Sequence, residues 1–281
     1  MERKLQVYTQ LNNNQIKIEK NNFNLVQTLE CGQVFSYELT KDGADILSAD
    51  KLAHVKDVGD GYILTSNDIS YFINYLDLET DYDKIKTELG RYELMKEPIK
   101  FGSGIRILKQ DIFETIISFI VSANNNIKRI KGILNRIRHD FGQKIENYYT
   151  FPTLKDLEKA DKEYFKSIGA GYRAEYLDKT LKMLHDFDIE KSKSLETSVL
   201  RKKLMSFQGI GRKVADCILL FGYSRQDVFP VDTWMQKMYS DSFTQCEDRT
   251  KISNILMQKF GNYSGYAQQY LFYYKRSSQN D

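Results

Sequence analysis

A lysine and an aspartate that lie 19 residues apart are the side chains of this sequence best suited to nucleophilic chemistry. Lys213 stands near the start of the segment RKVADCILLFG, and Asp232 lies in FPVDTW, two residues after Pro230. A lysine amine attacks carbon in its uncharged form, which partial burial on an apolar helix favours. The aspartate is placed to cap the next helix, whose dipole favours the ionised carboxylate. Such a pair could break a glycosidic bond, because the amine can attack the sugar while the carboxylate stabilises the positive charge that develops there.

A short glycine turn precedes this lysine. Residues 207–212 read FQGIGR and separate two segments with a helical pattern. Gly209 and Gly211 allow a very tight turn, because glycine tolerates positive φ. The N–H groups of the turn and of the following helix start, up to Val214, could bind one phosphate of a DNA backbone. An ordinary connection between two helices would use glycine in the same way, so the turn alone leaves both interpretations open.

The sequence of 281 residues has the composition of a globular protein, with 41% hydrophobic and 28% charged residues. That length fits one large domain or two modest ones. No apolar run reaches the ~18 residues of a membrane span, and the start lacks the apolar core of a signal peptide. We therefore expect an intracellular protein, in the cytoplasm or at the nucleoid of a prokaryote. The net charge of +3 hides an acidic first third and a basic remainder, which favours an anionic partner, although basic residues also simply solvate helix faces.

Cysteine and histidine spacing argues against a metal site. Cys31, Cys217 and Cys246 are too far apart for a zinc knuckle or a four-cysteine iron–sulfur loop. None of the three histidines has the spacing of a metal ligand pair. We expect no catalytic metal and no cofactor.

The hydrophobic patterns predict an α+β fold: an N-terminal antiparallel β-sheet domain over residues 1–98, followed by a larger all-helical domain over 99–281. Period-two segments separated by turn residues predict strands in the first part, among them QVYTQ, QIKIE, FSYELT, ADILSA, KLAHVKDV and GYILTS. Two short helices and a linker, EPIKFGSG, should follow. From residue 110 we expect helices nearly to the end, with QDIFETIISFIVSA as a buried central helix and PTLKDLEKA as a helix that starts at its proline.

Seven motifs, in order, carry a resemblance to a known family: CGQVFSY, GIRILKQD, FIVSANNNIKRI, GYRAEYL, GIGRKVADC, FPVDTW and YAQQYLF. Together they resemble the helix-hairpin-helix-Gly/Pro-Asp (HhH-GPD) superfamily of DNA glycosylases, and more closely the 8-oxoguanine DNA glycosylases of the eukaryotic type. The similarity runs from about Leu25 to Phe272. It implies a bifunctional DNA glycosylase and abasic-site lyase of base excision repair, acting as a monomer on double-stranded DNA, which flips 8-oxoguanine out of the duplex and excises it.

The resemblance also implies roles for single residues around the damaged base. Lys213 matches the nucleophile that attacks C1′ and forms a Schiff base, and Asp232 matches its partner. Gly32 matches the glycine whose carbonyl accepts a hydrogen bond from N7–H of 8-oxoguanine. Guanine has a lone pair at N7 in place of this N–H, so it cannot donate to the Gly32 carbonyl. Leaving a buried carbonyl without its hydrogen bond costs about 1–3 kcal/mol, which would favour 8-oxoguanine over guanine.

Three further residues match the walls of the base pocket. Phe272 matches the ring that stacks on the flipped base, Cys217 matches the residue on the other face, and Gln268 matches the reader of the Watson–Crick edge. Cys217 follows Lys213 by four residues, and Gln268 precedes Phe272 by four, so each pair shares one helix face. Without the resemblance, Cys217 and Phe272 would be interpreted as core residues.

The resemblance assigns a second group of residues to the DNA strand opposite the damaged base. Asn124 matches the asparagine that fills the hole left by the flipped base, and Arg129, Tyr172 and Arg173 match residues around the estranged cytosine. The resemblance therefore implies a preference for 8-oxoguanine opposite cytosine. By itself, Arg129 could equally belong to the solvated face of a basic helix.

One departure and two alternatives remain. Trp234 replaces a family histidine that is linked to a phosphate contact, so backbone binding there can differ. A non-catalytic helix-hairpin-helix module would use Lys213 only as a phosphate contact and Asp232 only as a helix cap. A glycosylase of the same fold with a different damaged base is the closer alternative.

Overall fold

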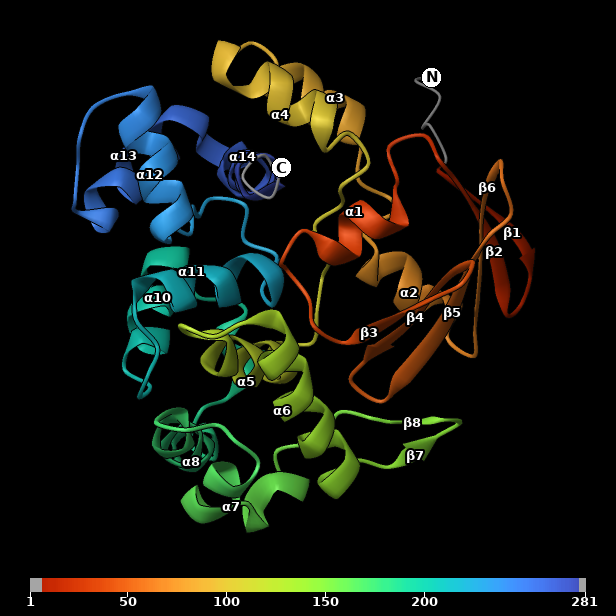
Figure 1. Ribbon diagram of the computed structural model, residues 1–281, viewed down its shortest axis with the longest axis vertical. Helices are drawn as coiled ribbons and strands as arrows, with labels where there is room; N and C mark the ends of the chain where they lie inside the picture. Colours follow the sequence, from red (N-terminus) through yellow and green to blue (C-terminus); the bar gives the residue numbers. More distant parts are fainter. Residues whose placement is uncertain (1–6, 278–281) are drawn as a thin grey trace. The chain divides into compact units, whose positions relative to one another are not determined.

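The structure is a computed structural model that describes residues 7–277 (Figure 1). The chain forms two compact units. The first contains the residues up to Ile46, Ala53–Lys109 and the residues from Gln226; the second contains Leu47–Leu52 and Gln110–Arg225. The predicted domain boundary between residues 98 and 99 stays a prediction. The compact units have other bounds than the predicted domains, because the C-terminal helices group with the N-terminal residues. Among residues 7–277, no helix has the length and apolar character needed to cross a membrane.

The first unit contains the antiparallel sheet that the sequence predicts. Its strand order is β1-β2-β6-β5-β4-β3. Each strand pairs in antiparallel register, as Tyr8 does with Ile18 and Ile18 with Tyr62. The strands are β1 Tyr8–Asn12, β2 Gln15–Glu19, β3 Tyr37–Thr40, β4 Gly43–Ser48, β5 Lys51–Asp57 and β6 Gly61–Ser66.

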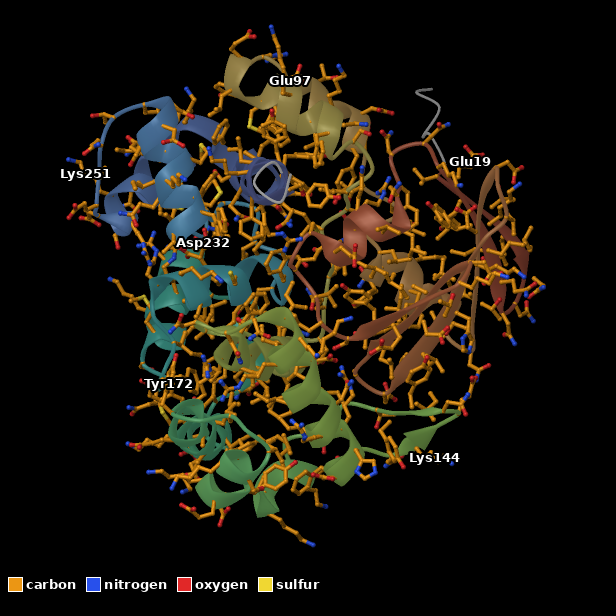
Figure 2. All side chains as sticks on the ribbon, viewed as in Figure 1. Glu19, Glu97, Lys144, Tyr172, Asp232 and Lys251 are labelled. Carbon is orange, nitrogen blue, oxygen red and sulfur yellow. The ribbon has the colours of Figure 1, made fainter. Side chains whose placement is uncertain are left out.

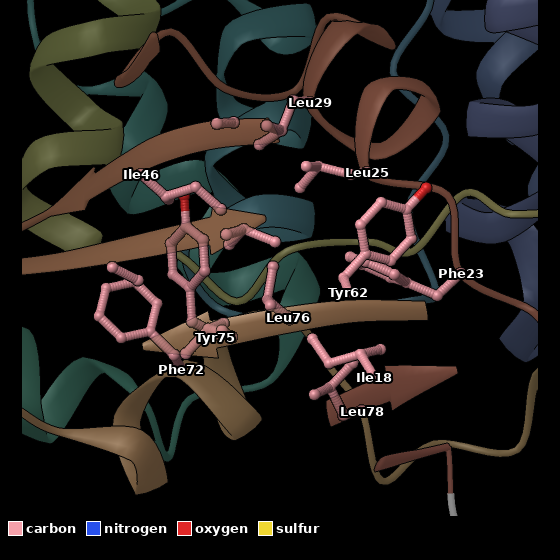
Figure 3. Packing of buried hydrophobic residues seen from close by; sticks show 14 of the residues in the cluster. Ile18, Phe23, Leu25, Leu29, Ile46, Tyr62, Phe72, Tyr75, Leu76 and Leu78 are labelled. Carbon is pink, nitrogen blue, oxygen red and sulfur yellow. The ribbon is translucent and has the colours of Figure 1, made fainter. Parts of the chain in front are cut away.

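One face of this sheet carries the hydrophobic core of the first unit (Figure 3). Ile16 and Ile18 of β2 are fully buried, whereas the residues between and beside them are more exposed, as the period of two requires. Leu29 and Phe72, from α1 and α2, pack on the same cluster. A fully buried side chain of this size contributes about 1.5–3 kcal/mol to folding.

The helices of the first unit include one that the sequence prediction made a linker. They are α1 Leu25–Glu30, α2 Ile69–Tyr75, α3 Tyr82–Leu89, α4 Lys96–Phe101, α12 Thr233–Ser242, α13 Arg249–Phe260 and α14 Ser264–Ser277, with 3-10 turns at Glu93–Met95 and Gly261–Tyr263. The linker prediction for EPIKFGSG was wrong. Pro98 lies in the first turn of α4, where a missing N–H costs no helical hydrogen bond. Helices α4, α12 and α13 pack on α14, which makes α14 the central helix of this group (Figure 1).

The second unit is mainly helical. Its elements are α5 Ile112–Ser122, α6 Ile127–Phe141, the hairpin of β7 Lys144–Ile145 and β8 Tyr148–Tyr149, a 3-10 turn at Asp156–Lys159, α7 Lys162–Ser167, α8 Arg173–Leu184, α9 Ile189–Ser192, α10 Thr197–Met205 and α11 Arg212–Phe221. As predicted, α5 is buried almost all round, and α6, α8 and α11 pack on it.

Two predictions for this unit were wrong. The chain is not helical throughout from residue 110, because β7 and β8 form a small antiparallel hairpin. The segment PTLKDLEKA does not start a helix at Pro152. The Asp156 carboxylate instead accepts hydrogen bonds from the Thr153 N–H at 2.8 Å and from the Thr153 hydroxyl at 2.7 Å. These bonds fold the segment after Pro152 into a turn, and the helical conformation is limited to the 3-10 turn at Asp156–Lys159.

Candidate active site

The glycine turn of the second unit joins α10 to α11 as a helix-hairpin-helix. Gly209 has φ +82°, and a Cβ there would lie 2.4 Å from the Tyr176 ring, so only glycine fits. Gly211 is the N-cap of α11 and provides no side-chain cap. The N–H groups of the first turn, up to Val214, are therefore not all used within the helix. With the helix dipole, these N–H groups could accept an anion, so the phosphate site stays a prediction.

Lys213 lies in that first turn of α11 and is half-buried. Its Nζ is 5.6 Å from the centre of the Phe119 ring on α5. Phe119 itself stacks on Phe221 at 5.5 Å between centroids. One turn further along α11, Cys217 is 4% exposed. Lys213 thus emerges from an apolar environment on the same helix face as Cys217, which is the local setting expected of an amine nucleophile.

A buried carboxylate fixes the hairpin from behind. Asp216 is fully buried, and its two oxygens accept from Nε of Arg201 at 2.5 Å and Nε of Arg212 at 2.9 Å. Arg201 belongs to α10, so the ion pairs connect both helices of the hairpin. Our sequence analysis missed this cluster, although the i,i+4 spacing of Arg212 and Asp216 was a signal for part of it.

Asp232 belongs to the first unit and is the N-cap of α12, as predicted (Figure 2). Its Oδ1 accepts from the Met235 N–H at 2.9 Å. Within residues 7–277, its second oxygen has no hydrogen-bond partner. The half-buried Trp234 lies in the first turn of the same helix. One oxygen of Asp232 thus secures the helix start, and the other is available for chemistry.

Gly32 lies against α14 in the first unit. Gly32 has φ +87°, and a Cβ there would lie 3.0 Å from Phe272 Cε1 and 2.9 Å from Arg276 Nη1. Phe272 therefore lies directly against Gly32; that its ring stacks on a flipped base stays a prediction. Gln268, one turn earlier on α14, is 6% exposed, and its Oε1 is buried without a hydrogen-bond partner in the described part of the chain. A buried acceptor without a partner is costly, so a donor from a ligand would be favourable here.

The three-asparagine turn between α5 and α6 is held by the start of α8. Asn124 is exposed with φ +49°. Arg173 is 3% exposed and donates from Nε to the Ala123 carbonyl at 2.7 Å and from Nη2 to the Asn124 carbonyl at 2.6 Å. Tyr172 is 53% exposed, and its hydroxyl donates to the Ala123 carbonyl at 3.2 Å. Arg173 thus supports the turn, and Tyr172 presents its ring at the surface (Figure 2).

Arg129 is exposed in the first turn of α6. Its Nη2 and Nε donate to the Gly169 carbonyl at 2.8 and 3.2 Å. The structure thus places Asn124, Arg129, Tyr172 and Arg173 in one small region of the second unit.

The candidate residues divide between the two units. Lys213, Cys217 and the opposite-strand group belong to the second unit, whereas Gly32, Asp232, Gln268 and Phe272 belong to the first. In the described residues, no group of three or more histidine, cysteine, aspartate or glutamate side chains could hold a metal ion. The expectation that the chain needs no metal or cofactor stays a prediction.

Two family models match successive parts of the chain. Residues 15–116 match the 8-oxoguanine DNA glycosylase N-terminal domain, and residues 117–261 match the HhH-GPD superfamily of base excision DNA repair proteins. The chain is therefore an HhH-GPD protein, with the α+β architecture that its sequence predicts. Within that superfamily, it belongs to the 8-oxoguanine DNA glycosylase family.

Named relatives agree with this membership. The N-glycosylase/DNA lyase of Saccharomyces cerevisiae is 33% identical over 60% of this chain and 56% of its own length. The chain thus spans little more than half the length of the yeast relative. A probable N-glycosylase/DNA lyase of Methanothermobacter thermautotrophicus is 31% identical over 73% of this chain and 74% of its own. The family is one of DNA glycosylases with DNA lyase activity.

A solved structure covers nearly the whole chain. The 8-oxoguanine glycosylase/lyase of Clostridium acetobutylicum, in complex with double-stranded DNA containing cytosine opposite 8-oxoguanine, is 35% identical with a TM-score of 0.92. The match covers 97% of this chain and 99% of that one.

Proposed function

We propose that this protein excises 8-oxoguanine, preferentially opposite cytosine, from duplex DNA, and that it does so through a Schiff base on Lys213. An enzyme with this substrate works where the genome lies, which would be the cytoplasm or nucleoid of a prokaryote. The observation that carries the proposal is the position of Lys213, in the first turn of α11 directly after the glycine hairpin, with its amine near Phe119. The Clostridium relative bound to DNA with cytosine opposite 8-oxoguanine supports the same substrate.

The chemistry assigns one role to each side chain. The amine of Lys213 attacks C1′, the bond from C1′ to N9 breaks, and the base leaves with the bonding electrons. The second oxygen of Asp232 stabilises the positive charge on the sugar during this step. Ring opening then gives the Schiff base. A base removes a proton from C2′, the bond from C3′ to its phosphate oxygen breaks, and the phosphate leaves as the 5′ end of the downstream strand, which nicks the DNA. The glycine hairpin between α10 and α11 binds one backbone phosphate through its N–H groups.

The base pocket selects the substrate in this proposal. The Gly32 carbonyl accepts from N7–H of 8-oxoguanine, Gln268 bonds to the Watson–Crick edge, and Phe272 and Cys217 contact the two faces. The unpartnered Gln268 Oε1 supports the assignment, because the base would supply the donor that this buried atom lacks. Asn124 would occupy the gap, Arg129 and Tyr172 would contact the estranged cytosine, and the buried Arg173 would hold the asparagine turn beside it.

Borohydride trapping tests the nucleophile. We would mix the protein with duplexes carrying 8-oxoguanine opposite cytosine or adenine, and with undamaged DNA. The expected result is a covalent adduct with the cytosine pair that is lost in Lys213→Gln and retained in Lys202→Gln, an exposed lysine on α10 of the same hairpin. No adduct with any duplex, despite salt-sensitive binding, would indicate a DNA-binding module. Equal trapping opposite adenine would remove the proposed roles of Arg129, Tyr172 and Arg173.

A further inference from the structure

The backbone turn that carries Gly32 is held from α14 at two successive carbonyls. The Arg276 guanidinium donates from Nη2 to the Glu30 carbonyl. Nε2 of Gln269 donates to the Cys31 carbonyl at 2.8 Å. Gln269 is 2% exposed and Cys31 is fully buried, so this second bond is shielded from water. The two peptide groups that precede the reading carbonyl are thus fixed by side chains of a single helix.

The other side of the turn is fixed by Gln33. This fully buried amide donates from Nε2 to the Thr28 carbonyl at 2.8 Å and to the Arg106 carbonyl at 2.7 Å. Its Oε1 accepts from the Leu108 N–H at 2.9 Å. Gly32 therefore lies between two anchored neighbours, in the left-handed conformation that glycine adopts freely.

The Gly32 carbonyl itself is left open. No hydrogen bond to it exists within residues 7–277, in contrast to the carbonyls of Glu30 and Cys31. The same helix that fixes those two carbonyls also carries Gln268 and Phe272. The spacing of Gln268, Phe272 and Arg276 is four residues each, so the three side chains follow one helix face. Arg276 also lies over the Phe272 ring, 5.5 Å from its centre.

We propose that Gln269 and Arg276 are positioning residues for damage recognition. They hold the Glu30–Gly32 backbone on α14 and so set the Gly32 carbonyl against the base-contacting side chains Gln268 and Phe272. The inference rests on the proposed function and adds two residues to it, neither of which needs to touch the base. A carbonyl held at a fixed distance can distinguish N7–H from a lone pair, whereas a mobile one could turn away from guanine and lose that discrimination.

Preformed abasic sites separate this role from a general one. Cleavage of an abasic duplex requires DNA binding and the lysine but no base reading, whereas excision of 8-oxoguanine requires all three. We would measure single-turnover rates on both substrates for the wild type, Arg276→Met, Arg276→Lys and Gln269→Leu. The matched control is Lys275→Met, which removes a positive charge from the same turn of α14 and loses an ion pair of 2.9 Å to Asp241.

The positioning role predicts that Arg276→Met lowers 8-oxoguanine excision by about tenfold, as expected for a lost hydrogen bond from a charged donor, while abasic cleavage stays within about twofold. Arg276→Lys should recover part of the loss, since its ammonium can still donate to the Glu30 carbonyl. Gln269→Leu should lose at least as much excision, and Lys275→Met should match the wild type on both substrates. Arg276 is only half-buried, so its variants remain informative if Gln269→Leu fails to fold.

Three results would overturn the inference. Variants of Arg276 that excise 8-oxoguanine at the wild-type rate would show that the contact with Glu30 has no role in reading. Equal losses on both substrates would assign the residues to folding or DNA binding. If the wild type cleaves abasic DNA but leaves 8-oxoguanine intact, the proposed substrate itself is wrong, and the inference falls with it.

Discussion

In the first unit, the turn around Gly32 is held by buried donors, whereas in the second unit the residues assigned to the opposite base are exposed. Gln269, which donates to the Cys31 carbonyl of this turn, is 2% exposed, but Tyr172 is 53% exposed. The second region has a buried support, Arg173, and its other side chains are exposed. Under the proposed function, this difference corresponds to a division in which a fixed backbone turn reads 8-oxoguanine and exposed side chains read its partner base. Changes in the first region should therefore cause larger losses than changes in the second.

The largest change in stability is expected outside these two regions, at the buried ion pairs of Asp216 behind the hairpin of the second unit. Asp216→Ala would leave Arg201 and Arg212 without their buried carboxylate, which typically costs 3–5 kcal/mol in the free energy of unfolding. Denaturant unfolding would measure it. Glu163→Ala is the control, because its ion pair with Lys166 on α7 is solvent-exposed and should contribute at most about 0.5 kcal/mol. Similar losses in both variants would show that the burial of Asp216 does not matter.

Gly32→Ala should abolish most of the damage reading. The substitution strains a backbone with φ +87° and places a Cβ 3.0 Å from Phe272, which together cost about 2–3 kcal/mol, or roughly 30- to 150-fold in excision. Cleavage of a preformed abasic site should change little. Gly59→Ala provides the matched control, because Gly59 also has positive φ but nothing within 4 Å of its Cβ position. Normal excision by Gly32→Ala would contradict the preorganised pocket.

Arg173→Met tests the buried support of the opposite-strand region. The carbonyls of Ala123, Asn124 and Ala170 would each lose the hydrogen bond from the Arg173 guanidinium, so the asparagine turn should loosen. We expect the preference for cytosine over adenine opposite 8-oxoguanine to fall by about tenfold. The ratio of excision rates on the two duplexes measures it. Arg136→Met, which removes a single bond from an exposed arginine to the Ile168 carbonyl, should leave that ratio unchanged.

The smallest effect is expected from Arg129→Met. Among the described residues, this exposed side chain hydrogen-bonds only to the Gly169 carbonyl. The loss of a solvated contact of this kind costs about 1 kcal/mol, or roughly fivefold in the preference for cytosine. Lys128→Met removes the neighbouring charge and should not alter the preference. A larger loss in Arg129→Met than in Arg173→Met would mean that the exposed side chain, and not the buried support, determines the choice of partner base.

Much of this organisation could be predicted from the sequence. Period-two alternation identified strands such as QIKIE, and the apolar character of 112–122 identified the central α5. The position of Asp232 before a helix predicted its cap. These features depend on residues near one another in the chain.

Other features depend on contacts that no local pattern contains. Gln269 and Arg276 are recognisable only once the carbonyls of Cys31 and Glu30 lie beside α14, more than 200 residues away in the sequence. Helix α4 was missed because Pro98 and two glycines nearby resemble a linker. The hairpin of β7 and β8 was missed because each strand has only two residues, too few to show a period.

One set of rates tests the division between the two regions most directly. Excision would be measured for the wild type, Gly32→Ala and Arg129→Met on 8-oxoguanine opposite cytosine and opposite adenine, with undamaged guanine opposite cytosine as the reference. We predict that Gly32→Ala lowers both 8-oxoguanine rates by the same factor and leaves their ratio intact, while Arg129→Met changes the ratio. If Gly32→Ala shifts the preference for the partner base as much as Arg129→Met does, the two regions do not read separate bases.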